Sequence, residues 1–174
     1  MSASRALDRA AVLAALETVN DPEIPVVSVV DLGIVQSVIV AGGHVTVAIT
    51  PTFSGCPALE VMRDEIRSAV LSIGADSVDV PVVLDPPWSS DRITPGARDR
   101  MRAIGLMPPP AVGRFRADPA LSLRMPPVEP DEAVPCPFCG SKDTVVENPF
   151  GPTICRSLHY CNACQQPFEA FKAL

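Results

Sequence analysis

Two cysteine pairs near the C-terminal end constrain the fold of this chain more than any other feature. Cys136 and Cys139 are separated by two residues, as are Cys161 and Cys164, and positions 140–160 lie between the pairs. Two residues between ligands allow a tight turn to direct both sulfurs at one ion, while N–H groups of the turn donate to the thiolates. The distance between the pairs lies just outside the roughly 15–20 residues of many zinc ribbons. We therefore predict one tetrahedral four-sulfur metal site.

The identity of the metal follows less directly from these spacings. A module of about 40 residues, 134–174, is too small to fold on its core alone, so bound metal would supply folding free energy. Structural zinc is the simplest assignment, with a redox iron or an iron–sulfur cluster as alternatives, because sulfur ligands suit both metals. Disulfides are the least favoured use of the six cysteines, since no apolar signal segment begins at Met1–Ala6. We expect a cytoplasmic, zinc-binding protein.

Two further residues lie close to the second cysteine pair. Cys155 and His159 precede Cys161 by six and two residues, so either could add to the ligand set or replace a member of it. The simpler interpretation makes Cys155 a packed thiol on a ribbon strand and His159 an exposed side chain. Cys155 is retained as a candidate extra ligand.

The first 106 residues alternate between helical and strand-like patterns. Apolar residues recur every three or four positions in the helical segments and at every second position in the strand-like ones. Gly42-Gly43 predicts a tight hairpin between two strands. Ser4, Pro57 and Thr94-Pro95 are typical of helix starts. The expected elements are a helix over 7–19, strands over 34–40 and 45–50, a helix over 57–73, a strand over 78–84 and a helix over 95–105.

This order, α-β-β-α-β-α, predicts an α+β fold for residues 1–106: a small two-layer sandwich with helices on one face of a sheet. Residues 107–133 are rich in proline and show no sustained periodicity, which is typical of a semi-rigid linker. The four-cysteine, zinc-ribbon-like module then occupies residues 134–174.

A loop cysteine and a short acidic segment form a second candidate site. Cys56 precedes the helix over 57–73, where free N–H groups and the helix dipole should lower its thiol pKa. Asp21 and Glu23 lie in an Asp-Pro-Glu-Ile-Pro segment that could reach the same end of the sheet and help to bind iron. Turn formation by these prolines and by Asp21 is the simpler interpretation.

Charge and missing motifs exclude several functions. Residues 1–106 contain 8 Arg and Lys against 13 Asp and Glu, and the remainder contains 6 against 7, so no basic surface for nucleic acid is expected. No apolar run reaches the roughly 18 residues of a membrane span. The sequence contains no phosphate-binding glycine loop and no acid–base constellation, so we expect no catalytic residues and no independent enzyme.

Particular motifs resemble known families. Asp21 to Pro25, Asp31-Leu32-Gly33 and Thr50 to Pro57 look like the iron–sulfur assembly domain of SufT-like proteins. Phe150 to Arg156, followed by Cys161 to Lys172, resembles the PaaD family of small subunits encoded with bacterial ring 1,2-phenylacetyl-CoA epoxidases. The resemblance implies that the four paired cysteines are ribbon ligands, that Cys155 matches an extra ribbon cysteine, and that Cys56 matches a loop cysteine that handles iron or a cluster.

The resemblance also implies a function and partners. PaaD-like subunits are expected to help mature the iron centres of an epoxidase in aerobic phenylacetate degradation, and to meet its oxygenase and reductase subunits without catalysing a reaction. Because one thiolate cannot hold a cluster alone, Cys56 would need a second subunit, another cysteine of this chain or the client protein. A homodimer is one further candidate assembly. A rubredoxin-like electron-transfer subunit and a purely structural subunit of the oxygenase complex are the alternatives.

Overall fold

The computed structural model describes residues 7–53, 55–110 and 133–172. The chain divides into two compact units, Met1–Arg100 and Met101–Leu174, and each unit contains its own sheet. Most of the predicted linker lies outside the described residues, as do Ser4 and Ser54, so the predicted domain limits stay a prediction.

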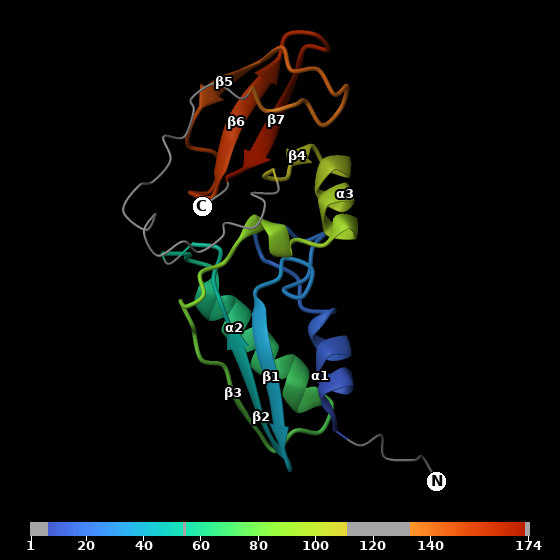
Figure 1. The fold of residues 1–174 in the computed structure, drawn as a ribbon, viewed down its shortest axis with the longest axis vertical. Helices are drawn as coiled ribbons and strands as arrows, with labels where there is room; N and C mark the ends of the chain where they lie inside the picture. The colour runs from blue at the N-terminus through green and yellow to red at the C-terminus, as the bar shows by residue number, and fades with distance from the viewer. Residues whose placement is uncertain (1–6, 54, 111–132, 173–174) are drawn as a thin grey trace, which may run out of the picture. The chain divides into compact units, whose positions relative to one another are not determined.

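The sheet of the first unit has the order β1-β2-β3 (Figure 1). Its strands are β1 (Val35–Ala41), β2 (His44–Ile49) and β3 (Ser77–Asp79). Strands β1 and β2 are antiparallel and close at the pair Ala41–His44, and Gly42 takes a φ of +63° in the turn. The predicted hairpin is confirmed, while β3 is shorter than predicted and runs parallel to β2.

Helix α1 (Arg9–Leu16) begins later than predicted and is capped by a different residue. The Asp8 carboxylate accepts a hydrogen bond of 2.8 Å from the Ala11 N–H. An Asp at this position satisfies a backbone donor that the first helical turn leaves free. The expected cap, Ser4, lies outside the described residues and precedes this helix start.

Helix α2 (Leu59–Ser72) packs its predicted apolar stripe into the core, with Met62, Ile66 and Val70 buried. It begins after Pro57, which was expected at its first position, and Ala58 forms its N-cap. Gly74, with a φ of +100°, follows its end. Helix α2 lies behind the sheet in Figure 1, beside α1, and both helices contact the strands, so these two elements form the helical layer.

The third predicted helix is α3 (Pro95–Ala103), preceded by the short 3-10 helix η1 (Ser90–Arg92). The Thr94 hydroxyl accepts a hydrogen bond of 3.2 Å from the Ala97 N–H, which confirms the predicted cap. The boundary between the two compact units falls within α3.

The second unit contains a four-stranded sheet in the order β4-β7-β6-β5. Strands β5 (Thr144–Asn148), β6 (Arg156–Cys161) and β7 (Gln166–Phe171) are antiparallel neighbours. Strand β4 (Leu106–Met107) adds parallel to β7. A strand of two residues has no periodicity to detect, so the sequence pattern does not predict β4.

In the described part of the chain, no helix combines the length and the apolar character needed to cross a membrane.

Candidate metal centre

Each cysteine pair lies in a tight turn closed by backbone hydrogen bonds. In the first turn the Gly140 N–H donates to the Cys136 carbonyl over 2.9 Å, and Gly140 takes a φ of +73°. In the second, which joins β6 to β7, the Gln165 N–H donates to the Cys161 carbonyl over 2.8 Å. The two turns therefore have the same construction, in which the last residue reverses the chain after the two sulfurs.

These turns bring the four sulfurs of Cys136, Cys139, Cys161 and Cys164 together. All four lie within 4.8 Å of one another. Two separations are 3.6 Å: Cys136 to Cys164 and Cys139 to Cys161. A tetrahedral zinc site with Zn–S bonds of about 2.3 Å places its sulfurs about 3.8 Å apart. The donor set and the spacing therefore fit a tetrahedral zinc ion, and they fit iron equally well.

The sulfurs are not electrostatically equivalent. The backbone N–H of Cys164 is the main influence that lowers the pKa of Cys161 to about 7. Burial, followed by the neighbouring sulfurs, raises the pKa of Cys164 to about 12. Since a metal binds thiolates, metal uptake must displace protons from these thiols, and Cys161 is easier to deprotonate than Cys164.

An apolar shell surrounds part of the cluster. Cys136 and Cys161 are buried together with Phe168, and Met107, Val134 and Cys164 pack against this group. Cys139 is exposed. Among the described residues this group consists of four cysteine sulfurs, and a four-cysteine ligand set is typical of structural rather than catalytic zinc sites.

Cys155 and His159 lie outside the four-sulfur group found among the described residues. Cys155 is buried, with its sulfur 3.1 Å from the Thr153 hydroxyl. The expectation that His159 is exposed is wrong. It is 4% exposed, stacks on Phe168 with ring centroids 5.2 Å apart, and lies 2.9 Å from the Ser157 hydroxyl. The inward face of β6 explains this, because residues 157, 159 and 161 alternate as buried positions.

Cys56 lies in the loop before α2, where its environment differs from the prediction. Burial is the largest influence and raises the pKa of its thiol. The charges of Glu23 and Asp21 raise it further, whereas hydrogen bonds from Ala58 and Leu59 act in the opposite direction. The predicted lowering by the helix N-terminus is therefore outweighed. The charges of Glu23 and Asp21 therefore act on the Cys56 thiol, in agreement with the expectation that the acidic segment reaches the same end of the sheet.

The Asp21 carboxylate also organises its own loop. One of its oxygens accepts hydrogen bonds from the N–H groups of Glu23, over 2.8 Å, and of Ile24, over 2.9 Å. Asp21 is 8% exposed. This is the turn-forming role favoured as the simpler interpretation, and the carboxylate is at the same time a fixed negative charge near Cys56.

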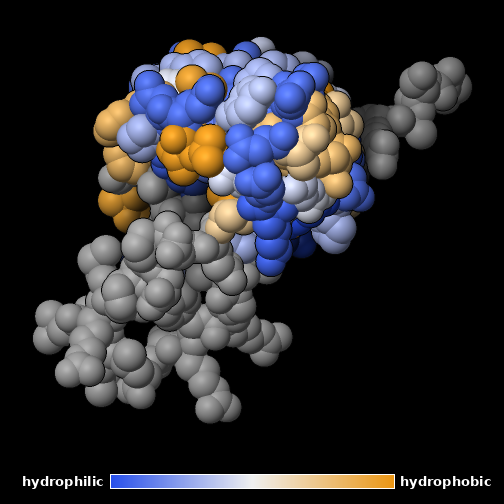
Figure 2. All heavy atoms as spheres, turned by 90° about the horizontal axis from the view of Figure 1, so that it is seen from above, coloured by the Kyte–Doolittle hydropathy of each residue, from blue (hydrophilic) through white to orange (hydrophobic). Residues whose placement is uncertain are grey.

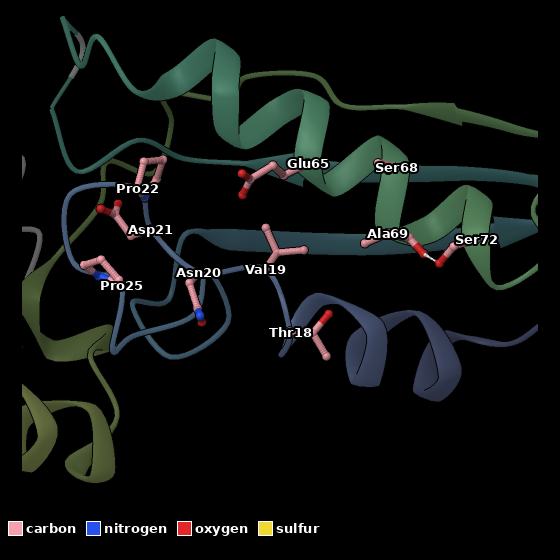
Figure 3. Close-up of a pocket in the computed structure, with 10 residues that line it drawn as sticks. All are labelled: Thr18, Val19, Asn20, Asp21, Pro22, Pro25, Glu65, Ser68, Ala69 and Ser72. Carbon is pink, nitrogen blue, oxygen red and sulfur yellow. Dashed lines mark hydrogen bonds between the residues drawn. The ribbon is translucent and has the colours of Figure 1, made fainter.

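A groove of about 510 Å³ separates this loop from α2. In Figure 3 the Glu65 carboxylate projects from α2 into the groove, across from Asp21 and Pro22 on the loop. Asn20, Ser68 and Ser72 also line it, and none of its lining residues is Lys or Arg. The groove is therefore rich in oxygen atoms and unsuited to an anionic ligand.

Comparison with known proteins assigns both parts of the chain. Residues 9–82 match the model of an iron–sulfur cluster assembly protein, and residues 125–172 match the PaaD zinc beta ribbon domain. An Escherichia coli K12 protein, named as one subunit of a "Putative 1,2-phenylacetyl-CoA epoxidase", is 39% identical over 161 residues, which cover 92% of this chain and 90% of that protein. The chain belongs to the PaaD family. The α+β fold and the zinc-ribbon-like module that the sequence motifs predicted are therefore confirmed.

The first unit of the PaaD chain has further relatives. An Fe-S protein maturation auxiliary factor of Porphyromonas gingivalis is 41% identical over 81 residues, covering 45% of this chain and 76% of that protein. A conserved hypothetical protein of Thermotoga maritima has a solved structure with a TM-score of 0.50 and 31% identity, covering 58% of this chain and 98% of that one. The first of these relatives is named for Fe-S protein maturation, and the second is similar to the first unit in fold and sequence.

Sequence reasoning missed two structural features, one beside the four-cysteine site and one within the first unit. Met107 lies beside the sulfur cluster although it was assigned to the linker. Arg100 pairs with Asp31 and donates to the Val26 carbonyl over 2.8 Å. Neither contact leaves a periodic trace in the sequence, because each joins residues far apart in the chain.

Proposed function

We propose that this chain is a non-catalytic maturation factor for the iron centres of a multicomponent ring epoxidase that acts on phenylacetyl-CoA. The observation that carries the proposal is the combination, in one chain, of an iron–sulfur assembly domain with a PaaD-type ribbon. The similarity to a protein named as an epoxidase subunit, over nine-tenths of the chain, supports an epoxidase as the protein that receives the iron. The oxygenase and reductase subunits are the proposed partners.

The two metal-related sites take different roles in this proposal. The four ribbon cysteines hold zinc, which stabilises the fold of the second unit and supplies no redox chemistry. Cys56 handles iron or a cluster in transit. Its loop contains no second cysteine among the described residues, so a ligand from the client, or from another copy of the chain, would complete the coordination.

The acidic surroundings of Cys56 suit transient handling. Burial raises the pKa of the Cys56 thiol, and the negative charges of Glu23 and Asp21 raise it further, so the free thiol stays protonated at neutral pH. A positively charged iron species lowers that pKa and is attracted by both carboxylates. The site would therefore bind iron species and release them again, as a carrier requires.

The test is replacement of Cys56 by Ser in cells that express the oxygenase and reductase subunits and lack any other PaaD-type protein. We expect the purified epoxidase to contain several-fold less iron and to have correspondingly lower activity, while the ribbon retains its zinc. Iron content and specific activity equal to those obtained with the unmodified chain would refute the role of Cys56.

A matched control uses the other cysteine outside the ribbon ligand set. Cys155→Ser also removes a thiol, but from a residue that is remote in sequence from the acidic segment that contains Asp21 and Glu23. Iron loading of the epoxidase should be unaffected by it. Equal losses with Cys56→Ser and Cys155→Ser would indicate a general effect of thiol loss rather than iron handling by Cys56.

A further inference from the structure

Strand β4 joins the metal-binding unit through its backbone. Leu106 pairs with Glu169 and Met107 with Ala170 in the parallel ladder between β4 and β7. The Glu169 N–H donates to the Gly105 carbonyl over 3.2 Å. Leu106 is 2% exposed. These two residues lie well before position 125, where the match to the ribbon family begins, and yet they complete the ribbon sheet.

The side chain of Met107 lies against the buried part of the four-cysteine site. It packs on the buried group formed by Cys136, Cys161 and Phe168. Cys136 belongs to the first cysteine turn and Cys161 to the second. An unbranched thioether side chain adapts to such an irregular surface, and in this position it packs on a buried group that includes one cysteine of each turn.

A second contact joins the same segment to the first cysteine turn. A Cβ atom added to Gly105 would lie 2.8 Å from the Phe138 ring, so the ring rests directly on the Gly105 backbone. Phe138 is one of the two residues between Cys136 and Cys139. Gly105 also takes a φ of +78°, which favours glycine. Residues 105–107 therefore contact both the turn and the cluster.

We propose that Met107 is a positioning and shielding residue of the four-sulfur centre, and that the metal-binding module includes residues 105–107. An apolar shell controls the access of water and competing ligands to a metal site. With Met107 in place, a chelator or a proton reaches the Cys136 and Cys161 sulfurs only after β4 moves away. The segment before the linker thereby sets how slowly the ribbon loses its metal.

The experiment measures zinc transfer from the full-length, zinc-loaded chain to a coloured chelator in excess. Met107→Ala should speed transfer by about tenfold or more, in line with the effects of residues that support metal ligands. Ile104→Ala is the matched control, because Ile104 lies in the same segment and is 52% exposed. Its transfer rate should equal that of the unmodified chain.

Cobalt substitution separates shielding from loss of the site. Ligand-field bands of Co²⁺ in the Met107→Ala chain should keep the intensity of a tetrahedral four-thiolate site, because all four ligands remain. Strong bands together with fast metal transfer support the proposal. Strong bands with the unmodified transfer rate overturn it, as does equal acceleration by Ile104→Ala.

Two milder variants decide the matter if Met107→Ala does not fold. Met107→Leu keeps the apolar volume and should retain the slow transfer, whereas Met107→Gln keeps the length, adds a polar amide and should speed it. Equal rates in these two variants overturn the proposal, and so does failure of the unmodified chain to bind zinc or cobalt. None of these outcomes depends on whether the chain matures an oxygenase.

Discussion

Among single residues, Asp31 connects its own loop with α3. Its carboxylate accepts hydrogen bonds from the hydroxyls of Ser28, over 3.1 Å, and of Thr94, over 2.8 Å, and it pairs with Arg100. Burial by itself raises the pKa of Asp31, but the two hydroxyls and the Arg100 charge outweigh it and lower the pKa overall. The ionised carboxylate therefore stabilises the junction between its loop and the start of α3.

This lowered pKa predicts a pH-dependent effect of Asp31→Asn. Because the folded pKa lies below the unfolded value of 3.8, the stabilisation is fully present above about pH 4 and is lost as the pH falls through the folded pKa. Above pH 5 the variant should lose about 1 kcal/mol of unfolding free energy. Denaturant unfolding at pH 7 and at pH 3 measures the difference, which should shrink at the lower pH. A constant difference would contradict the assignment.

Two glycines with similar φ angles predict different costs of substitution. Gly33 has a φ of +67°, and an added Cβ would lie 2.3 Å from the Arg92 Cβ and 2.8 Å from its carbonyl oxygen. Gly42 has a φ of +63° and no neighbour within 4 Å. Gly42→Ala should cost about 1 kcal/mol from backbone strain alone. Gly33→Ala should cost roughly 2–4 kcal/mol, because overpacking adds to the strain.

Thermal unfolding of both alanine variants at pH 7 checks this comparison. Since the φ angles nearly match, the difference in melting temperature isolates the contact with Arg92. Equal melting temperatures would show that the η1 segment moves aside at little cost.

Among the elements, the ribbon strands depend on the metal most directly. The buried group of the second unit includes Cys136 and Cys161 themselves, so the ligands are also core residues. Without a metal, ionised thiolates would repel one another at the centre of this small core, and neutral thiols would no longer be joined through a shared ion. The sheet β5-β6-β7 therefore needs the metal in a way that the sheet β1-β2-β3 does not.

Metal removal should accordingly unfold the two units unequally. Zinc removal by a chelator at pH 7 should abolish amide-exchange protection in β5, β6 and β7, while α2 and β2 remain protected. Acid should have the same effect, since protons compete with the metal for the thiolates. Amide hydrogen exchange read out by mass spectrometry resolves the two regions. Retained protection in the metal-free ribbon would contradict the structural role of zinc.

Single-cysteine variants test the same prediction at the ligands. Cys139→Ser should lower zinc affinity by at least tenfold, although Cys139 is exposed and contributes little to the core. Cys155→Ser should leave zinc content at one ion per chain, because Cys155 lies outside the four-sulfur group. Elemental analysis after dialysis measures both.

Across the whole molecule, exposed apolar side chains are numerous on the second unit. Phe138, Val145, Val146, Phe150 and Ile154 are each about half exposed or more. On the face that Figure 2 shows, hydrophobic groups are interrupted by hydrophilic ones rather than joined in one patch. Such scattered apolar groups are common on protein surfaces, so they do not by themselves define a partner surface.

Local patterns in the sequence determined much of this protein. The spacing within each cysteine pair predicted the two turns of the four-sulfur group, Gly42-Gly43 predicted the hairpin, and the apolar spacing of α2 predicted its buried face. Each of these signals is a short-range pattern in the chain. Tertiary structure decided the rest. Burial and two distant carboxylates reversed the expected pKa shift of Cys56, stacking on Phe168 buried His159, and the pairing of β4 with β7 placed Met107 on the sulfur cluster. These outcomes depend on contacts between residues far apart in sequence, which no local spacing encodes.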